Sequence, residues 1–188
     1  MKYLTPLIVV VLSFSDSAVA EFPEFLDASI TEAVQPVVVL IPGQLFGSGS
    51  KDLVIPLASG NSPNISFPLY VLKSVAEQGA TKQTKKSEGD GLIVDPVETR
   101  IMRFGTYAKA SGNRDRAGNF YDVNTGNLLL LVYVDRPCRI EGEVMGRGKV
   151  YVHEIDFNRA GFHWVSEVNS GLLKNVANST KVEFRVGQ

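Results

Sequence analysis

A run of seven consecutive apolar residues, Leu128–Val134, constrains the fold more than any other feature of this 188-residue sequence. The run is too short to cross a membrane as a helix, which takes about 20 apolar residues. A strand with one face in solvent alternates apolar and polar residues, whereas a strand covered on both faces is apolar throughout. We therefore expect Leu128–Val134 to be the central strand of the core.

Short β-branched and aromatic runs recur along the whole chain. Glycine (17) and proline (9) are spread between them, a spacing typical of sandwiches and barrels rather than of alternating strands and helices. The sequence predicts an all-β fold, namely a single-domain antiparallel β-sandwich with at most one short helix. A small closed β-barrel is the alternative. Strands are expected at residues 37–41, 53–57, 66–74, 91–94, 98–109, 128–134, 138–144, 149–157, 162–167 and 181–186, and a helical turn at residues 170–178.

The first twenty residues have the layout of a cleavable secretory signal. Lys2 supplies the positive end, an apolar stretch follows, and Ala18 and Ala20 place small residues at positions −3 and −1 of the expected cut. The apolar stretch is about half as long as a membrane span requires. The sequence predicts a signal peptide over residues 1–20 and one β-rich domain over residues 21–188. The product would be a bacterial protein, periplasmic or secreted, with no membrane span after cleavage.

Charge and cysteine content narrow the possible partners. The 19 basic and 20 acidic residues give a net charge of −1, which offers no basic surface for nucleic acid. Cys138 is the only cysteine, so an internal disulfide is impossible and packing alone must stabilise the domain. We interpret Cys138 as a small buried core residue. The expected partner is a protein or a carbohydrate.

Residues 149–167 form the best-defined local unit of the sequence. Two alternating stretches flank residues 158–161, which suit a hairpin loop because Gly161 can adopt a positive φ. In the register that this loop implies, Asp156 lies opposite His163. One face of the hairpin is then apolar and is expected to lie on the core. It contains Ile155, Phe157, Phe162 and Trp164.

The opposite face of the predicted hairpin carries the one constellation that suggests enzyme chemistry. Glu154, Asp156 and His163 would share it, and three such side chains can hold a metal ion or serve a hydrolase. An ordinary cross-strand pair of Asp156 and His163 explains the same residues. His153 would project to the other face, away from His163. We therefore assign no catalytic residue, and a hydrolase or metal-dependent enzyme using this face is the alternative function.

A second set of candidate ligands lies in residues 113–122. Asn113 and Asp115 place oxygen donors at the first and third positions and Gly118 occupies the sixth, as at the start of a calcium-binding loop. The fifth position has no donor, and turns rich in Asn, Asp and Gly are common without any ion. The sequence predicts no required cofactor. A weak calcium site made by Asn113, Asp115 and Asp122 is the metal candidate.

The same polar stretch is the predicted recognition surface. Phe120 and Tyr121 are adjacent, so one of them faces solvent if they lie in a strand. An exposed aromatic ring beside amides and arginines suits a protein or glycan ligand. We predict Arg114 and Tyr121 as binding residues. The predicted function is that of an exported soluble module that binds protein or glycan without catalysis.

Overall fold

The structure is a computed structural model that describes residues 24–30, 37–43, 64–79, 81–82, 91–109, 115–146 and 148–186. Within these residues the chain is mostly strand with one helix, α1 (Leu69–Gly79), which confirms the all-β class. The expected signal peptide at residues 1–20 and the expected strand at residues 53–57 lie outside them. None of the described helical residues form a segment long and apolar enough to cross a membrane.

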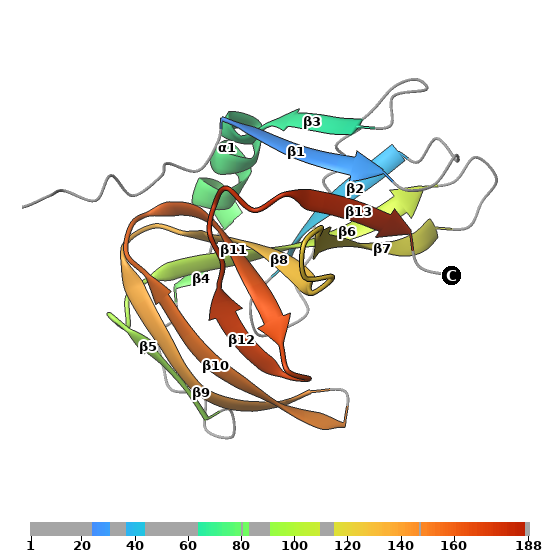
Figure 1. Cartoon of the computed structure of the whole chain (residues 1–188). Coiled ribbons are helices and arrows are strands. Elements are labelled where there is room, and N and C mark those ends of the chain that lie inside the picture. The colour runs from blue at the N-terminus through green and yellow to red at the C-terminus, as the bar shows by residue number, and fades with distance from the viewer. Residues whose placement is uncertain are drawn as a thin grey trace, which may run out of the picture.

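The described strands belong to one continuous open sheet (Figure 1). Its members are β1 (Phe25–Ile30), β2 (Val37–Gly43), β3 (Asn64–Pro68), β4 (Thr81–Lys82), β5 (Gly91–Asp95), β6 (Arg100–Lys109), β7 (Asp115–Asp122), β8 (Leu128–Val134), β9 (Cys138–Gly146), β10 (Lys149–Phe157), β11 (Gly161–Val168), β12 (Leu172–Asn175) and β13 (Val182–Val186). The strand order is β3-β1-β13-β7-β6-β8-β11-β12-β10-β9-β5, and β2 and β4 also pair with β6. Two pairs are parallel, β1 with β13 and β10 with β12, and the others are antiparallel.

β8 is the central strand that its composition predicts. It lies between β6 and β11, and its successive side chains alternate between two separate cores. Leu129, Leu131 and Tyr133 point to one face of the sheet, whereas Val132 and Val134 point to the other, and all five are buried. The absence of polar residues from Leu128–Val134 follows from this position, because neither face of the strand meets water.

The core on the first face, which we call the helix-side core, packs under α1. Aromatic rings from β7, β11 and β13 meet there edge to face, with ring centres 5.4 Å apart for Phe120 and Trp164 and 5.5 Å apart for Phe120 and Phe184. This geometry is favoured between aromatic rings. The helix-side core consists of Ala28, Leu69, Leu72, Ala76, Met102, Phe104, Phe120, Leu129, Leu131, Tyr133, Phe162, Trp164, Val182 and Phe184.

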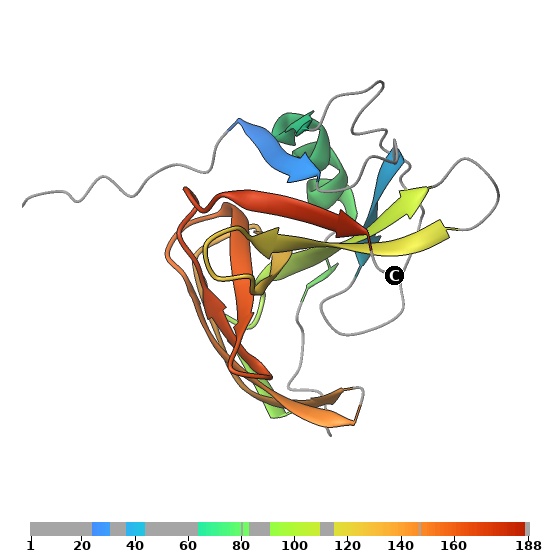
Figure 2. The ribbon, with the colours of Figure 1, turned by 45° about the vertical axis from the view of Figure 1, so that its right-hand side comes forward.

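The core on the second face, which we call the inner core, lies inside the curled end of the sheet (Figure 2). Seven strands contribute to it, from β6 around to β5, so the sheet wraps its own apolar side chains, and the described helix does not contribute to this core. The inner core consists of Leu92, Ile101, Val132, Val134, Cys138, Ile140, Ile155, Phe157, Val165 and Leu173.

The strand expected at residues 66–74 is wrong beyond Pro68. β3 ends at Pro68 and α1 begins at the next residue. Proline immediately before the first helical residue costs no intrahelical hydrogen bond. Leu69, Leu72 and Ala76 then follow at helical spacing and are buried in the helix-side core, while Lys73 and Glu77 form an exposed ion pair one turn apart. The helical spacing of the buried residues determined the conformation of this segment, although its β-branched residues favour a strand.

The helical turn expected at residues 170–178 is also wrong, because β12 occupies Leu172–Asn175. Asn169 and Ser170 both have positive φ (47° and 56°), which reverses the chain after β11. Gly171 follows with φ 133°, and a Cβ there would lie 2.7 Å from the carbonyl oxygen of Val150. Residues 169–171 therefore form a tight turn rather than a helix cap.

The predicted hairpin of residues 149–167 contains two strands that do not pair with each other. β12 lies between them, parallel to β10 and antiparallel to β11. His153 on β10 and Glu167 on β11 consequently do not face each other. Leu173 on β12 lies between them as the register partner of both. The predicted single apolar face is wrong for the same reason. Phe162 and Trp164 belong to the helix-side core, whereas Ile155 and Phe157 belong to the inner core.

Candidate functional site

Tyr121, a predicted binding residue, lies on the face of β7 opposite to the buried ring of Phe120. The guanidinium carbon of Arg185 stands 4.6 Å from the centre of the Tyr121 ring. The Nε of Arg185 also donates a hydrogen bond of 2.8 Å to the Glu183 carboxylate, and Glu183 is the register partner of Tyr121. This tyrosine is thus covered on one ring face by a cation of its own sheet. Arg114 lies outside the described residues.

Two of the predicted calcium ligands, Asp115 and Asp122, lie far apart in the structure. Asp115 and Asp122 stand at the two ends of β7, and a strand of its eight residues spans about 23 Å at ~3.3 Å per residue. Two residues so far apart cannot hold one ion. The Asp122 carboxylate is buried and accepts a 2.8 Å hydrogen bond from the backbone N–H of Asn124, so it stabilises the turn after β7. Asn113 lies outside the described residues.

The face that was expected to combine Glu154, Asp156 and His163 does not exist. Glu154 and Asp156 are exposed, and Glu154 forms an ion pair of 2.9 Å with Lys174. His163 is buried on the opposite side of the sheet. The insertion of β12 removed the register on which the prediction rested. Across the described ranges, no three His, Cys, Asp or Glu side chains lie close enough together to hold a metal ion.

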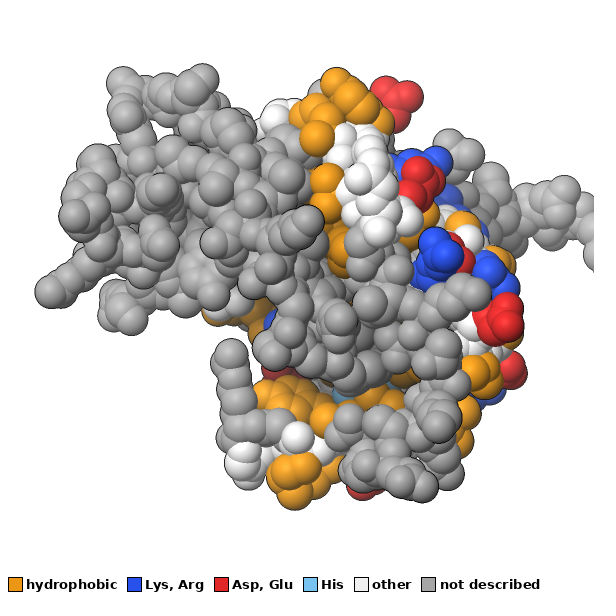
Figure 3. All heavy atoms as spheres, turned by 180° about the vertical axis from the view of Figure 1, so that it is seen from behind, with side chains coloured by type: hydrophobic (Ala, Val, Ile, Leu, Met, Phe, Trp, Pro, Cys, Tyr) orange, Lys and Arg blue, Asp and Glu red, His pale blue; other side chains and the backbone are white. Residues whose placement is uncertain are grey.

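Both histidines lie on the inner-core side, which corrects the expectation that they project to opposite faces. The His163 ring packs on Phe157 with centres 4.7 Å apart, and its Nε2 donates to the carbonyl oxygen of Arg159 at 2.9 Å. His153 lies between Gly142 and Leu173 in the register. Burial lowers the pKa of both imidazoles. Seen from behind, a histidine lies among hydrophobic side chains in a hollow of the surface (Figure 3). Both act as neutral core residues.

Cys138 is buried in the inner core, which confirms its predicted role. Burial raises the pKa of its thiol to about 11. The thiolate is the nucleophilic form of cysteine, so this side chain is inert at neutral pH. It packs as part of the inner core.

Two charged side chains at the open end of the inner face form an ion pair with each other. The Nζ of Lys149 lies 2.5 Å from Oε1 of Glu167, and the same ammonium stands 4.7 Å from the centre of the Tyr151 ring. The ion pair joins β10 to β11 across the intervening β12. Lys149, Glu167 and Tyr151 thus close this end of the curled sheet.

The outer face of the curled sheet, which points away from the inner core, carries apolar side chains that reach solvent. Met145 on β9 and Val150 on β10 are direct cross-strand partners, and they are 71% and 42% exposed. Three partly exposed residues, Val152, Leu172 and Val168, continue this surface as neighbours in one register row across β10, β12 and β11. We call these five residues the outer strip.

The outer strip was missed in the sequence because Leu172 was expected in a helical turn and not in a strand beside Val152 and Val168. A signal was present: near the β9–β10 turn, Val144 and Met145 are adjacent, as are Val150, Tyr151 and Val152, so both faces of the strands are apolar where only one can be covered. No protein-family model, no curated protein and no solved structure matches the chain. Because a fold alone does not determine an activity, the function has to be derived from these residues.

Proposed function

We propose that this protein is exported, periplasmic or secreted, and binds another protein on the outer strip without catalysing a reaction. The observation that carries the proposal is the contiguous exposure of the five strip residues. Single exposed apolar side chains are normal on protein surfaces, whereas contiguous ones mark interaction sites. Met145 suits such a site because its unbranched thioether side chain adapts to a partner's surface.

A protein ligand is better supported than a glycan. Sugar rings bind on the flat faces of exposed aromatic side chains. Among the strand side chains that the structure describes, Tyr121 and Tyr151 are partly exposed, and each has a cation stacked over its ring, Arg185 and Lys149 respectively. These stacking faces are used within the chain. The outer strip, by contrast, consists of aliphatic side chains that suit a protein surface.

A binding role is better supported than an enzymatic one. The described histidines and the cysteine are buried. Burial lowers the pKa of both imidazoles and raises the pKa of the thiol, which favours the neutral form of each group. A general base or a nucleophile needs access to the reacting atom and a pKa near the working pH. The sandwich arrangement expected from the sequence remains part of the proposal, supported by the packing of β1 and β13 on the same helix-side core as β8 and β11.

The charges around the outer strip indicate the chemistry of the partner. The outer face of β9, β10 and β12 holds four exposed carboxylates, Glu141, Glu143, Glu154 and Asp156, and two exposed cations, Arg139 and Lys174. Glu143 is the register partner of Val152, so a negative charge borders the strip. Two copies docked face to face would bring like charges together, which disfavours association. The fitting partner presents apolar side chains flanked by lysine or arginine.

The test places a photo-crosslinking amino acid at position 145 in the cells that produce the protein. Position 123 is the matched control, because Val123 is 48% exposed in the turn after β7 and is not one of the five strip residues. We expect one protein to crosslink at position 145 and not at position 123. That protein should bind the purified chain with a defined stoichiometry. Equal crosslinking at the two positions, or a captured protein that does not bind the purified chain, would overturn the proposal.

A further inference from the structure

A second surface lies at the end of the sheet order. β5 pairs with β9 on one side and with no other described strand. It forms the margin of the curled sheet in Figure 1. An edge strand directs the N–H and C=O groups of alternate residues away from the sheet, where they can bond to a further strand.

Within Gly91–Asp95, β5 has no lysine, no proline and no bulge, and Pro96 follows only after the strand ends. Proteins protect edges with lysine, proline, bulges or inward charges. The residues of β5 read Gly-Leu-Ile-Val-Asp, and they match β9 one to one from Gly91 to Asp95 without a bulge. Ile93, at the centre of the strand, is 51% exposed. Its side chain and the main-chain edge are therefore both accessible among the described residues.

We propose that β5 pairs antiparallel with β5 of a second copy of this chain, so that the two sheets become continuous. The pairing is centred on Ile93, which meets its own equivalent on the outer face. On the inner face, Leu92 of each copy meets Val94 of the other. An isologous contact of this kind closes after two copies.

The side chains of β5 are self-complementary in this register. Both contacts beside the centre are apolar, and Asp95 faces Gly91, which has no side chain to oppose the carboxylate. The nearest acidic neighbours, Glu141 and Glu143, stand on β9, one strand further from the contact. Asp95 lies two strand spacings, about 10 Å, from Glu143 of the second copy, and its own equivalent is offset by four residues, about 13 Å along the strand. Salt screens charges over such distances. The contact is separate from the outer strip and goes beyond the proposed function.

Sedimentation equilibrium of the purified protein over a wide concentration range tests this inference. We expect a monomer–dimer equilibrium in the unmodified protein. Ile93→Lys should weaken the dimer at least about ten-fold, because it places two cations opposite each other at the centre of the contact. Val97→Lys is the matched control, since Val97 is 53% exposed but lies beyond the end of β5, and it should leave the equilibrium unchanged.

A mixture of two variants makes the test independent of folding defects. Ile93→Glu alone should be monomeric for the same reason as Ile93→Lys. An equal mixture of the two should dimerise again, because opposite charges then meet at position 93. The inference is overturned by an unmodified protein that stays monomeric at every concentration, by a dimer that Ile93→Lys leaves intact, or by a mixture that does not associate.

Discussion

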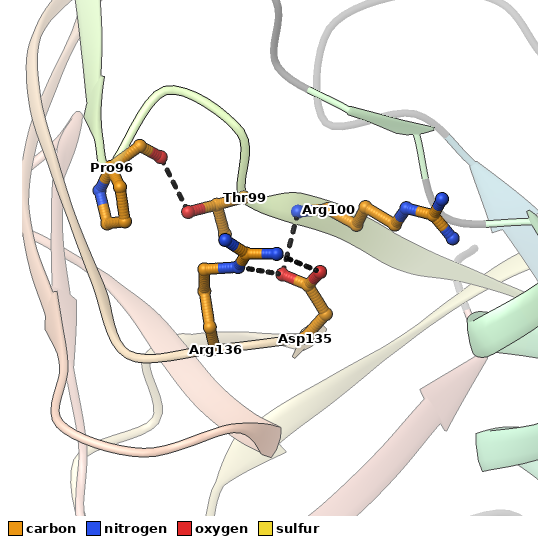
Figure 4. A network of polar contacts seen from close by, with 5 residues as sticks. All are labelled: Pro96, Thr99, Arg100, Asp135 and Arg136. Carbon is orange, nitrogen blue, oxygen red and sulfur yellow. Dashed lines mark hydrogen bonds and ion pairs between the residues drawn. The ribbon is translucent and has the colours of Figure 1, made fainter.

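Asp135 binds Arg100 at both of its backbone groups, and Figure 4 shows the bond to its carboxylate. The carboxylate accepts a 2.8 Å hydrogen bond from the N–H of Arg100, and the backbone N–H of Asp135 donates to the carbonyl oxygen of Arg100 at 3.1 Å. Arg100 is the first residue of β6 and Asp135 follows the last residue of β8. The pair thus fixes the register of two strands whose side chains enter both cores.

Replacing Asp135 by alanine should lower the free energy of unfolding by about 1 kcal/mol, because one backbone donor loses its acceptor at a partly exposed site. Asp135→Asn keeps an oxygen acceptor and should cost less. The measurement is urea denaturation followed by circular dichroism. Arg136→Ala is the control, since its contacts of 3.3 Å with the same carboxylate lie at the surface. An Arg136 variant as unstable as the Asp135 variant would contradict this assignment.

Gly142 should tolerate no side chain. Its φ is 118°, and a Cβ would lie 1.9 Å from the carbonyl oxygen of Gly91 on the neighbouring strand β5. We expect Gly142→Ala to lower the unfolding free energy by more than about 3 kcal/mol, since backbone strain and a backbone clash combine. Gly126→Ala also places alanine at positive φ, with nothing within 4 Å, and should cost about 1 kcal/mol. Similar losses in both variants would show that β5 does not approach β9 closely.

Stability should fall as the pH drops below about 6.5. That is the usual pKa of an unfolded histidine. Burial lowers the pKa of His153 and His163 in the folded state, so the unfolded chain binds more protons at acid pH and is favoured there. The histidine contribution is complete above pH 6.5 and is lost as the pH falls toward the folded pKa values.

Carboxylates also titrate in acid, so His163→Gln isolates the histidine effect. Glutamine keeps a donor for the Arg159 carbonyl and does not titrate. Unfolding free energies measured from pH 5 to pH 8 should fall less steeply for this variant than for the unmodified protein. Equal slopes would mean that His163 titrates alike in the folded and unfolded chain.

Cys138 should resist alkylation in the folded protein. With a thiol pKa of about 11, it holds very little thiolate at pH 8, and its burial excludes the reagent. Mass spectrometry should show that iodoacetamide labels Cys138 slowly in buffer and rapidly in about 8 M urea, a concentration that unfolds most domains. Rapid labelling without denaturant would place Cys138 at the surface.

Local features of the sequence predicted most strands and failed where a distant segment decided the outcome. Leu128–Val134 is buried on both faces, and its composition alone indicates this. The turn at residues 158–161 implied a hairpin, because the sequence does not show that Leu172–Asn175 inserts between the two strands. Four residues are too few for a recognisable alternation. That one insertion moved His163 away from Asp156 and divided the predicted apolar face between two cores.

The candidate site depended on the same insertion. Val152, Leu172 and Val168 become neighbours only because β12 separates β10 from β11. Phe120 and Tyr121 point to opposite faces of β7, as expected for neighbouring residues of a strand, and Tyr121 is the one that is partly exposed. Its contact with Arg185 joins residues far apart in the sequence and could not be anticipated.

The affinity of the crosslinked partner for strip variants tests the central claim most directly. In calorimetric titrations, the double variant Met145→Glu with Val150→Glu should bind about a hundred-fold more weakly than the unmodified protein, because central apolar contacts dominate interface energies. The control Val123→Glu, which adds one negative charge at another exposed valine, should bind like the unmodified protein. Unchanged binding by the double variant, or equal weakening by the control, would contradict docking on the outer strip.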